Sequence, residues 1–466
     1  MRILYFTALS AGIASLLACT PNGDFIAIRH ATVITATDAP PLNSATILVA
    51  GHNIVEVGPD GDVSVPRSAT VIDATGQFVI PGLWEMHAHL SKTRASAMGL
   101  FVANGVTTVR DMGGDHEELL GWRREVAQGD RIGPRMLLAG PYLESTRNVE
   151  RMRNTPVEEM IEPVERTRIP VGSPAEARRV VDSIAQLELD YIKIRTVQDS
   201  ATYRAIADAA QTVDLDLVGH VTFFTPELIL AAGQRGVDHF LFPTLDDRTR
   251  DERMTVFTQF ADADIGAVPT LVTLSASVFA PDSLVRAVME DSLGVSEPRR
   301  AYLSKYLVDD WREQALERDT SQLEFFRQVY GSTLRNLREM REAGVRIMAG
   351  SDVAVLMIFP GSTLHDELAL FVTELGMTPM EAIESATRLP AEFLGLADST
   401  GTIEGGKVAD LLILDADPLT DITNTRRIVS VVLRGELFTA ADLDMLLAGV
   451  ISAPDQRIND WPRTHR

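Results

Sequence analysis

Cysteine is almost absent from this 466-residue sequence: Cys19 is its only copy, so no disulfide bond can form within the chain. Positive charge is also in deficit. The sequence has 43 Lys and Arg residues but 65 Asp and Glu residues, which gives a formal net charge of −22. This charge argues against nucleic acid as a partner, because such binding needs a basic surface. Beyond the first residues, no apolar run is long enough to predict a membrane-spanning helix. What remains, 45% hydrophobic and 23% charged residues, is typical of a globular protein with a large core.

The first 19 residues are typical of a bacterial targeting segment. The stretch from Ile3 to Leu17 is apolar but too short to remain as a membrane span. It ends in Leu16-Leu17-Ala18-Cys19, which resembles the lipobox of bacterial lipoproteins, where the cysteine is lipidated. We therefore expect residues 1–19 to be a lipoprotein signal peptide. Cys19 would anchor the protein in the cell envelope, facing the periplasm at the outer membrane, with no other membrane contact; a plain secretory signal is the alternative.

The apolar pattern divides the rest of the chain into two kinds of sequence. Residues 24–80 and 396–440 contain short strands separated by turns, and we expect them to form one small β-sandwich built from both ends of the chain. Residues 81–395 alternate strand-length apolar runs with helical periodicity, which predicts an α/β fold, a (β/α)8 TIM-like barrel. Residues 441–466 are left as a C-terminal tail.

Two segments of the predicted barrel are longer than ordinary connections. Residues 144–173 are charged and arginine-rich, and residues 275–337 are long and helical in pattern. Both follow predicted strands, so both should lie on the face where the carboxyl ends of the strands meet, which carries the active site in such barrels. The sequence assigns neither segment a role. The eight strands are expected near residues 83–89, 106–111, 135–140, 190–195, 215–220, 237–241, 264–270 and 345–352.

The first of these strands ends in His87-Ala88-His89. Side chains two residues apart on a strand point to the same side, so the two imidazoles converge. Two neutral imidazoles aimed at one point are half of a zinc site. The pattern therefore predicts a metal centre at this end of the strand.

Four further polar residues lie within or at the ends of later strands: Lys193, His220, His239 and Asp352. Each has an ordinary alternative, since a strand-end histidine is often a hydrogen-bonded core residue, an aspartate can cap a helix and a lysine can snorkel. Together with the His-x-His pair, however, they give six metal-competent groups in barrel order. The joint pattern favours a metal site over six unrelated core residues.

The chain resembles the amidohydrolase superfamily of metal-dependent hydrolases. Within it, the chain is similar to the binuclear group of imidazolonepropionase-like enzymes and prolidase-like dipeptidases. The resemblance covers nearly everything after residue 24. It is carried by Val79-Ile80-Pro81-Gly82-Leu83-Trp84-Glu85-Met86-His87-Ala88-His89, Gly105-Val106-Thr107-Thr108-Val109-Arg110-Asp111, Ile192-Lys193, Gly219-His220, Asp238-His239, Gly350-Ser351-Asp352 and Lys407-Val408-Ala409-Asp410-Leu411.

The resemblance implies two divalent metal ions and a modified lysine. Zinc is expected, although Mn, Co or Fe would also suit these ligands. A hydroxide shared by the two ions would attack the substrate carbonyl, and Asp352 would act as general base and then as acid. A buried lysine has a depressed pKa, so its neutral amine can add CO2 and become a bridging carbamate. By this resemblance, His87, His89 and Asp352 hold the buried ion, His220 and His239 the more exposed one, and Lys193 bridges both.

Substrate contacts are harder to assign from the residues alone. Arg110 and Arg195 are each candidates to clamp a substrate carboxylate, with a rim salt bridge as the alternative. Tyr142 is a candidate donor to the carbonyl oxygen, with a loop anchor as its alternative. Many prolidase-like relatives place a second histidine shortly after the ligand that corresponds to His220. Here Val221-Thr222-Phe223-Phe224 follows and predicts an apolar pocket wall.

We therefore expect an enzyme that hydrolyses the C–N bond of a small-molecule amide or dipeptide. A prolidase-like dipeptidase or carboxypeptidase and a lactonase or phosphotriesterase-type hydrolase stay open as alternatives. A non-catalytic binding protein on the same barrel is disfavoured, because all six metal-competent residues are kept. The sequence names neither the substrate nor the oligomeric state, and a homo-oligomer is left open.

Overall fold

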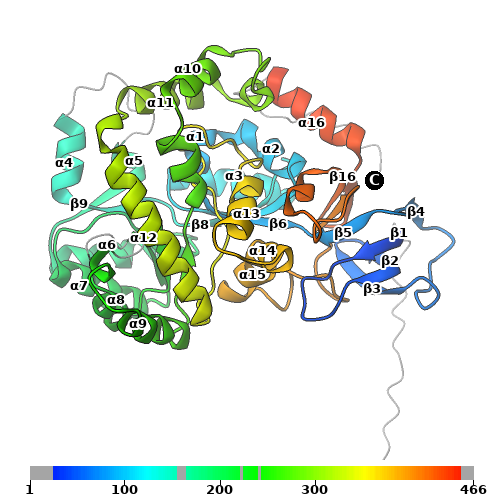
Figure 1. Cartoon of the computed structure of the whole chain (residues 1–466), viewed down its shortest axis with the longest axis horizontal. Helices are drawn as coiled ribbons and strands as arrows, with labels where there is room; N and C mark the ends of the chain where they lie inside the picture. Colours follow the sequence, from blue (N-terminus) through cyan, green and yellow to red (C-terminus); the bar gives the residue numbers. More distant parts are fainter. Residues whose placement is uncertain (1–24, 155–163, 221–223, 240–242, 453–466) are drawn as a thin grey trace, which may run out of the picture.

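The computed structural model describes residues 25–154, 164–220, 224–239 and 243–452, and its fold is mixed α/β (Figure 1). Residues 1–19, and with them Cys19, lie outside the described residues, so the lipoprotein assignment stays a prediction. Within the part of the chain that the structure describes, no helix is both long and apolar enough to cross a bilayer.

Two parallel sheets lie at the centre of the larger part of the molecule. One has the order β6-β7-β8 and the other the order β10-β9-β11-β12-β13-β14. Strands β6, β7 and β11 are buried at every residue, as expected where helices cover a parallel sheet. The strands are β6 (Leu83–Ala88), β7 (Val106–Asp111), β8 (Arg135–Leu138), β9 (Tyr142–Ser145), β10 (Arg168–Val171), β11 (Tyr191–Ile194), β12 (Asp216–His220), β13 (Gly236–Asp238) and β14 (Gly266–Val268).

Individual backbone bonds connect these two sheets. Segment 345–353 makes isolated parallel bridges to both, pairing Ile347 with Ala267 of β14 and Val353 with Ala88 of β6. At the other end, the amide of Asp190, just before β11, donates to the carbonyl of Leu138 in β8 over 2.9 Å. The segment of the eighth predicted strand therefore pairs through two single bridges and does not form a continuous strand.

Amphipathic helices pack around the sheets, and most begin at side-chain caps. Asp115, Ser173, Asp199, Thr225 and Thr249 each accept a backbone N–H in the first turn of the helix that follows. The helices between the parallel strands and after them are α1 (Leu90–Thr93), α2 (Met98–Ala103), α3 (His116–Gln128), α6 (Pro174–Ile184), α7 (Ser200–Thr212), α8 (Pro226–Ala232), α9 (Arg250–Asp262), α12 (Leu323–Glu342), α13 (Leu364–Thr373), α14 (Pro379–Ser385) and α15 (Arg388–Phe393).

The two long segments contain structure of their own. Segment 144–173 holds the second half of β9, then α4 (Thr146–Asn154), α5 (Val164–Thr167) and β10, with residues 155–163 outside the description. The pairing of β9 with β10 and β11 was not predicted. Segment 275–337 contains α10 (Asp282–Glu290), α11 (Lys305–Leu316) and the first part of α12. Helices α10 and α11 lie at the top of Figure 1, and α12 runs down through the middle of that view.

Strands from both ends of the chain form one eight-stranded sheet. Its order is β17-β16-β15-β5-β1-β2-β3, and β4 pairs with β1. The antiparallel pairing of β5 with β15 joins the two ends. These hydrogen bonds make one continuous sheet; the two-layered sandwich and the domain boundaries stay predictions. The strands are β1 (Phe25–Val33), β2 (Leu42–Ala50), β3 (Asn53–Pro59), β4 (Thr70–Asp73), β5 (Phe78–Pro81), β15 (Leu411–Leu414), β16 (Ile428–Leu433) and β17 (Glu436–Phe438).

The C-terminal segment is not only a tail. Helix α16 (Ala440–Ser452) packs beside α2, with Leu446 and Val450 buried. Figure 1 shows it beside the last strands of the composite sheet. Residues 453–466 of the predicted tail lie outside the described residues.

Candidate metal centre

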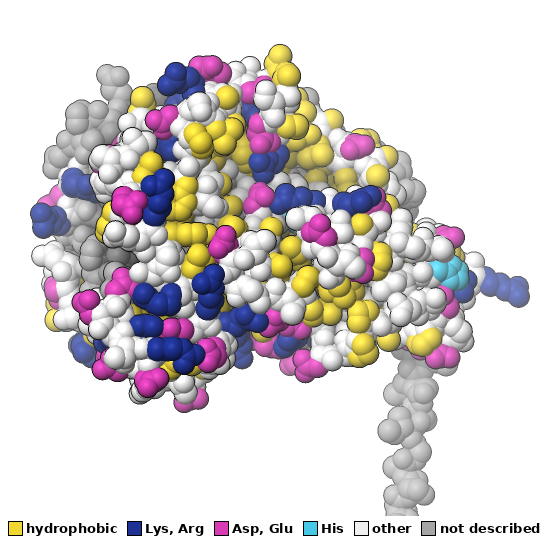
Figure 2. All heavy atoms as spheres, viewed as in Figure 1, with side chains coloured by type: hydrophobic (Ala, Val, Ile, Leu, Met, Phe, Trp, Pro, Cys, Tyr) yellow, Lys and Arg dark blue, Asp and Glu magenta, His cyan; other side chains and the backbone are white. Residues whose placement is uncertain are grey.

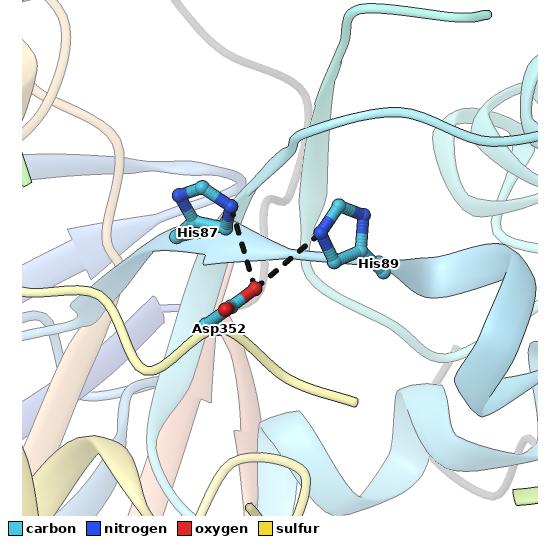
Figure 3. Close-up of side chains that lie close together, drawn as sticks. All are labelled: His87, His89 and Asp352. Atoms are coloured by element: carbon cyan, nitrogen blue, oxygen red, sulfur yellow. Dashed lines mark ion pairs between the residues drawn. The ribbon is translucent and has the colours of Figure 1, made fainter. Parts of the chain in front are cut away.

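His87 and His89 lie at the end of β6 and point toward one carboxylate. The Nε2 atoms of both imidazoles are 3.4 Å from Oδ1 of Asp352, as Figure 3 shows. One ligand atom from each of the three residues fits within a group no wider than 4.8 Å. The structure therefore brings together the three residues that the resemblance assigns to one metal ion.

Glu85, which the sequence analysis did not single out, connects the histidine pair to the segment that carries Asp352. Its carboxylate is fully buried and accepts hydrogen bonds from the amide of His87 (2.9 Å) and from the amide (2.8 Å) and hydroxyl (2.5 Å) of Ser351. Burial raises the pKa of Glu85 to about 7 against the effect of these donors. Glu85 thus fixes β6 to the segment that carries Asp352.

His220 and His239 extend the cluster from β12 and β13. The His239 ring lies 4.3 Å from the His87 ring and 4.8 Å from the His220 ring, measured between centroids. Its Nδ1 is 2.8 Å from the hydroxyl of Thr270 and 3.8 Å from Oδ2 of Asp352. Burial, with Lys193 nearby, lowers the pKa of His87 and His220, and burial also lowers that of His239. These imidazoles are therefore neutral at physiological pH, which is the form that binds a metal ion.

Lys193 is buried beneath the histidines. Burial lowers the pKa of its amine to about 8 although Asp238 lies near, with Nζ 3.7 Å from Oδ2 of that residue. Among the described residues, neither Nζ of Lys193 nor either ring nitrogen of His87 has a hydrogen-bond partner. Buried polar atoms without partners are costly. A metal ion at Nε2 of His87 and a carbamate on Lys193 would satisfy two of these three atoms, and Nδ1 of His87 lies 3.4 Å from Oδ1 of Asp238. The donor set therefore fits the metal group that the resemblance implies.

Arg110, a candidate for binding a substrate carboxylate, lies in the interior and forms a buried ion pair. Its side chain is fully buried, and Nη2 donates to Oδ1 of Asp238 over 2.8 Å. Burial alone would raise the pKa of Asp238, but Arg110 and Lys193 outweigh it and hold that pKa below its usual value. The same Oδ1 lies 3.4 Å from Nδ1 of His87. Arg110 thus pairs with a buried carboxylate rather than with a group at the rim, because β7 is buried along its whole length, and its role toward a substrate stays a prediction.

Tyr142 contacts a candidate ligand rather than an open pocket. Its hydroxyl lies 3.0 Å from Nδ1 of His89, which is also 3.2 Å from the carbonyl oxygen of Gly113. These two contacts orient the ring so that Nε2 faces Asp352. Arg195, by contrast, is partly exposed and forms an ion pair with Glu144.

Two aromatic residues pack elsewhere in the structure. His365 is buried between the hydroxyl of Thr425 and the carbonyl of Asn104. Phe224, at the end of the predicted apolar wall, stacks on Tyr203 of α7, with ring centroids 4.2 Å apart. The other residues of the predicted apolar wall, 221–223, lie outside the described residues.

The backbone is unusual at three of the residues that meet here. His239, Thr270 and Asp352 have φ angles of 65°, 47° and 59°. For a residue with a Cβ, such a left-handed conformation costs on the order of 1 kcal/mol or more and is typical of functional sites. Each angle turns a polar side chain toward the same cluster.

Comparisons with known proteins agree with this geometry. The amidohydrolase family matches residues 78–438. Ochratoxinase of Aspergillus niger is 22% identical over 429 residues, which cover 85% of this chain and 82% of that protein. Adenine deaminase of Rubrobacter xylanophilus is 35% identical over 81 residues, but these cover only 17% of this chain and 13% of the deaminase.

A solved structure is similar over nearly the whole fold. A prolidase candidate from Bifidobacterium longum superimposes with a TM-score of 0.69 and 26% identity, covering 92% of this chain and 99% of that one. The resemblance seen in the sequence is thereby confirmed. The chain belongs to the amidohydrolase family and is a hydrolase that acts on carbon–nitrogen bonds.

Proposed function

We propose that this hydrolase is binuclear and cleaves the amide bond of a small-molecule amide or dipeptide. The observation that carries the proposal is the convergence of neutral imidazoles, a buried lysine and a carboxylate on one place, with buried nitrogens that lack partners among the described residues. The ligand sets are those that the resemblance implies: His87, His89 and Asp352 for one ion, His220 and His239 for the other, and carbamylated Lys193 between them.

When bound, the metal ions lower the pKa of a water to about 7 and polarise a carbonyl oxygen. Two residues of the chain have roles of their own, Asp352 in proton transfer and Lys193 in forming the carbamate. Asp352, close to both His87 and His89, takes a proton from the attacking water and returns it to the leaving nitrogen. Lys193, with a pKa of about 8, has a neutral fraction that reacts with CO2 at neutral pH.

The proposal includes a closed (β/α)8 barrel. The bridges of segment 345–353 to β6 and β14, and the bond from Asp190 to β8, link the two parallel sheets at both ends. In such a barrel the carboxyl ends of the strands share one face, which accounts for the meeting of side chains from β6, β12 and β13.

We further propose that Cys19 anchors the enzyme in the cell envelope, facing the periplasm.

Metal content tests the binuclear centre. Protein purified with zinc and bicarbonate should contain close to two metal equivalents. Lys193→Met should lower this number, whereas Lys305→Met, at an exposed position on α11, should not. A reproducible single equivalent in the wild type contradicts the bridging lysine.

A substrate panel tests the reaction. Dipeptides, N-acyl amino acids and cyclic amides should include hydrolysed compounds. Lactones and phosphotriesters are assayed beside them as the alternative chemistry on the same metal ions. Hydrolysis confined to the latter two classes would reject amide cleavage as the function.

A further inference from the structure

Segment 275–337, which contains α10 and α11, packs against the chain that follows Asp352. Its outer face carries charged side chains of both signs, which Figure 2 shows over the region where Figure 1 places these two helices. Its inner face is apolar, and Trp311 of α11 is fully buried, with its ring 5.1 Å from that of Phe359. One buried cluster joins the two parts of the chain and includes Val285, Val288, Leu307, Val308, Trp311, Ala354, Leu356, Met357 and Phe359. The segment therefore covers the turn that comes directly after a candidate metal ligand.

Two side chains of α11, one helical turn apart, hold the backbone of this turn. Nε1 of Trp311 donates to the carbonyl of Ala354 over 3.2 Å. The side-chain amide of Gln314 donates to the same carbonyl over 3.3 Å, and its oxygen accepts from the amide of Leu356 over 2.8 Å. One planar group thus binds a backbone acceptor and a backbone donor at once, which fixes the orientation of the chain two residues beyond Asp352.

The turn at residues 352–357 depends on such contacts, because it lies outside the strands of either parallel sheet. Asp352 and Met357 have φ angles of 59° and 69°. Residues with a Cβ keep this left-handed conformation only where the surrounding structure holds them. The amide of Asp352 donates to the carbonyl of His87 over 2.9 Å, and its carbonyl accepts from the amide of Val355 over 2.9 Å. A displacement of the turn is therefore passed directly to the backbone of Asp352.

Helix α11 also contacts the chain that follows the other ligands. The carboxylate of Asp310 accepts a hydrogen bond from Nε2 of Gln314 over 2.7 Å and lies 3.8 Å from Nζ of Lys92. Lys92 belongs to α1, which begins directly after His89. Asp310 itself is buried, so this connection is shielded from solvent on the α11 side. One helix thus connects the chain after His89 with the chain after Asp352.

We infer that α11 sets the position of the Asp352 carboxylate against His87 and His89, and that Gln314 is the positioning residue. This inference rests on the proposed metal centre. Gln314 acts through the backbone, since its partners are Asp310 and the turn rather than the histidines. Ligand distances at a metal ion vary by only about 0.2 Å, so a small displacement of the carboxylate weakens binding. Segment 275–337, to which the sequence assigns no role, thereby has one in the metal centre.

Three variants separate positioning from packing. Gln314→Met keeps the length of the side chain but removes its hydrogen bonds. Trp311→Phe keeps most of the buried ring and loses the indole N–H, and it provides the same test should Gln314→Met fail to fold. Gln322→Met is the matched control, because Gln322 is exposed in the same segment and its side chain bonds Asp319 at the surface.

Hydrogen exchange of the metal-free protein measures the positioning itself. The informative amides are those of Asp352 and Val355, because the amide of Leu356 loses its own acceptor in Gln314→Met whatever the role of the residue. We expect both informative amides to exchange about 10-fold faster in Gln314→Met, in keeping with the net contribution of a hydrogen bond. The increase should be smaller in Trp311→Phe, and Gln322→Met should match the wild type.

Zinc titration against a chelator measures the consequence for the metal centre. Gln314→Met should bind its tighter zinc ion about 10-fold more weakly than the wild type, as is usual when a group that supports a ligand is lost. Gln322→Met should keep the wild-type affinity. A purely structural role of Gln314 predicts a different result: a less stable metal-free protein whose folded form binds zinc like the wild type.

The two measurements decide the inference separately from the proposed function. Faster exchange at Asp352 together with weaker zinc binding in Gln314→Met supports it. Unchanged exchange at Asp352 and Val355 overturns it, and so does a zinc affinity equal to that of the wild type. A wild type that binds no zinc rejects the proposed metal centre, and the exchange result, obtained without metal, then supports or overturns the inference by itself.

Discussion

Glu367 on α13 should make the stability of the protein depend on pH, because its carboxyl is buried and forms no ion pair with a described residue. It accepts hydrogen bonds from the amides of Leu271 (2.9 Å) and Val272 (2.7 Å), directly after Thr270, which contacts His239. Burial is the main reason that its pKa is raised to about 8, and the nearby Glu85 adds to it. The folded protein therefore holds a proton here that the unfolded chain releases near pH 4.5.

The sign and size of the effect follow from this difference. Below about pH 4.5 the carboxyl is protonated in both the folded and the unfolded state, and its contribution to the free energy of unfolding is at its maximum. As the pH rises toward 8, the unfolded chain has lost the proton while the folded protein keeps it, so the free energy of unfolding falls by about 1.4 kcal/mol per unit. Between pH 5 and pH 8 the wild type should lose about 4 kcal/mol from this group.

Glu367→Gln removes the titrating carboxyl and replaces one of its two accepting oxygens with an NH2 group. The amide side chain has a single oxygen for two backbone donors, so one buried N–H loses its partner, at about 1–3 kcal/mol. The variant should therefore be less stable than the wild type at pH 5 and as stable or more stable at pH 8. Urea unfolding at four pH values measures this crossing, with Glu324→Gln, exposed on α12, as the control. Parallel pH curves for the wild type and Glu367→Gln would show that the carboxyl titrates normally and refute the reasoning.

Three further changes test the proposed site and its location. Asp352→Asn keeps an oxygen near His89 but cannot carry a proton, so metal content should be largely retained while turnover falls by roughly 10²–10⁴-fold; full activity would remove Asp352 from proton transfer. Tyr142→Phe removes one contact to His89 and should weaken metal binding about 10-fold in a chelator titration, whereas unchanged affinity would make Tyr142 a packing residue only. Cys19→Ser should abolish membrane fractionation of the expressed protein, and a wild type that is soluble without detergent and has an unmodified Cys19 contradicts the anchor.

The regular alternation of a strand explains which parts of the site the sequence could predict. His87 lies on β6 and His89 directly follows the last residue of that strand, and both face Asp352. Asp238 was missed because it directly precedes His239, and alternation would place these two on opposite sides. The left-handed backbone of His239 breaks the alternation, so both side chains reach the same cluster.

Other differences arise where local sequence does not specify long-range pairing. Strands β9 and β10 have four residues each, and β10 contains Pro170, so neither gives a clear two-residue period. Glu85 lies on the same side of β6 as His87, but two of the three hydrogen bonds to its carboxylate come from Ser351, 266 residues away. The overall α/β class, in contrast, depends on repeated apolar runs and was predicted correctly.

The composite sheet has a consequence for how the protein is made. Strand β5 needs β15 as a neighbour, yet some 330 residues of chain separate them. During synthesis, the edge of β5 therefore stays unpaired until the ribosome has released nearly the entire polypeptide. An open strand edge is a template for aggregation. A nascent chain that stalls before residue 411, or a truncation there, should thus be insoluble even with the parallel sheets complete, and chaperone demand should peak late in translation.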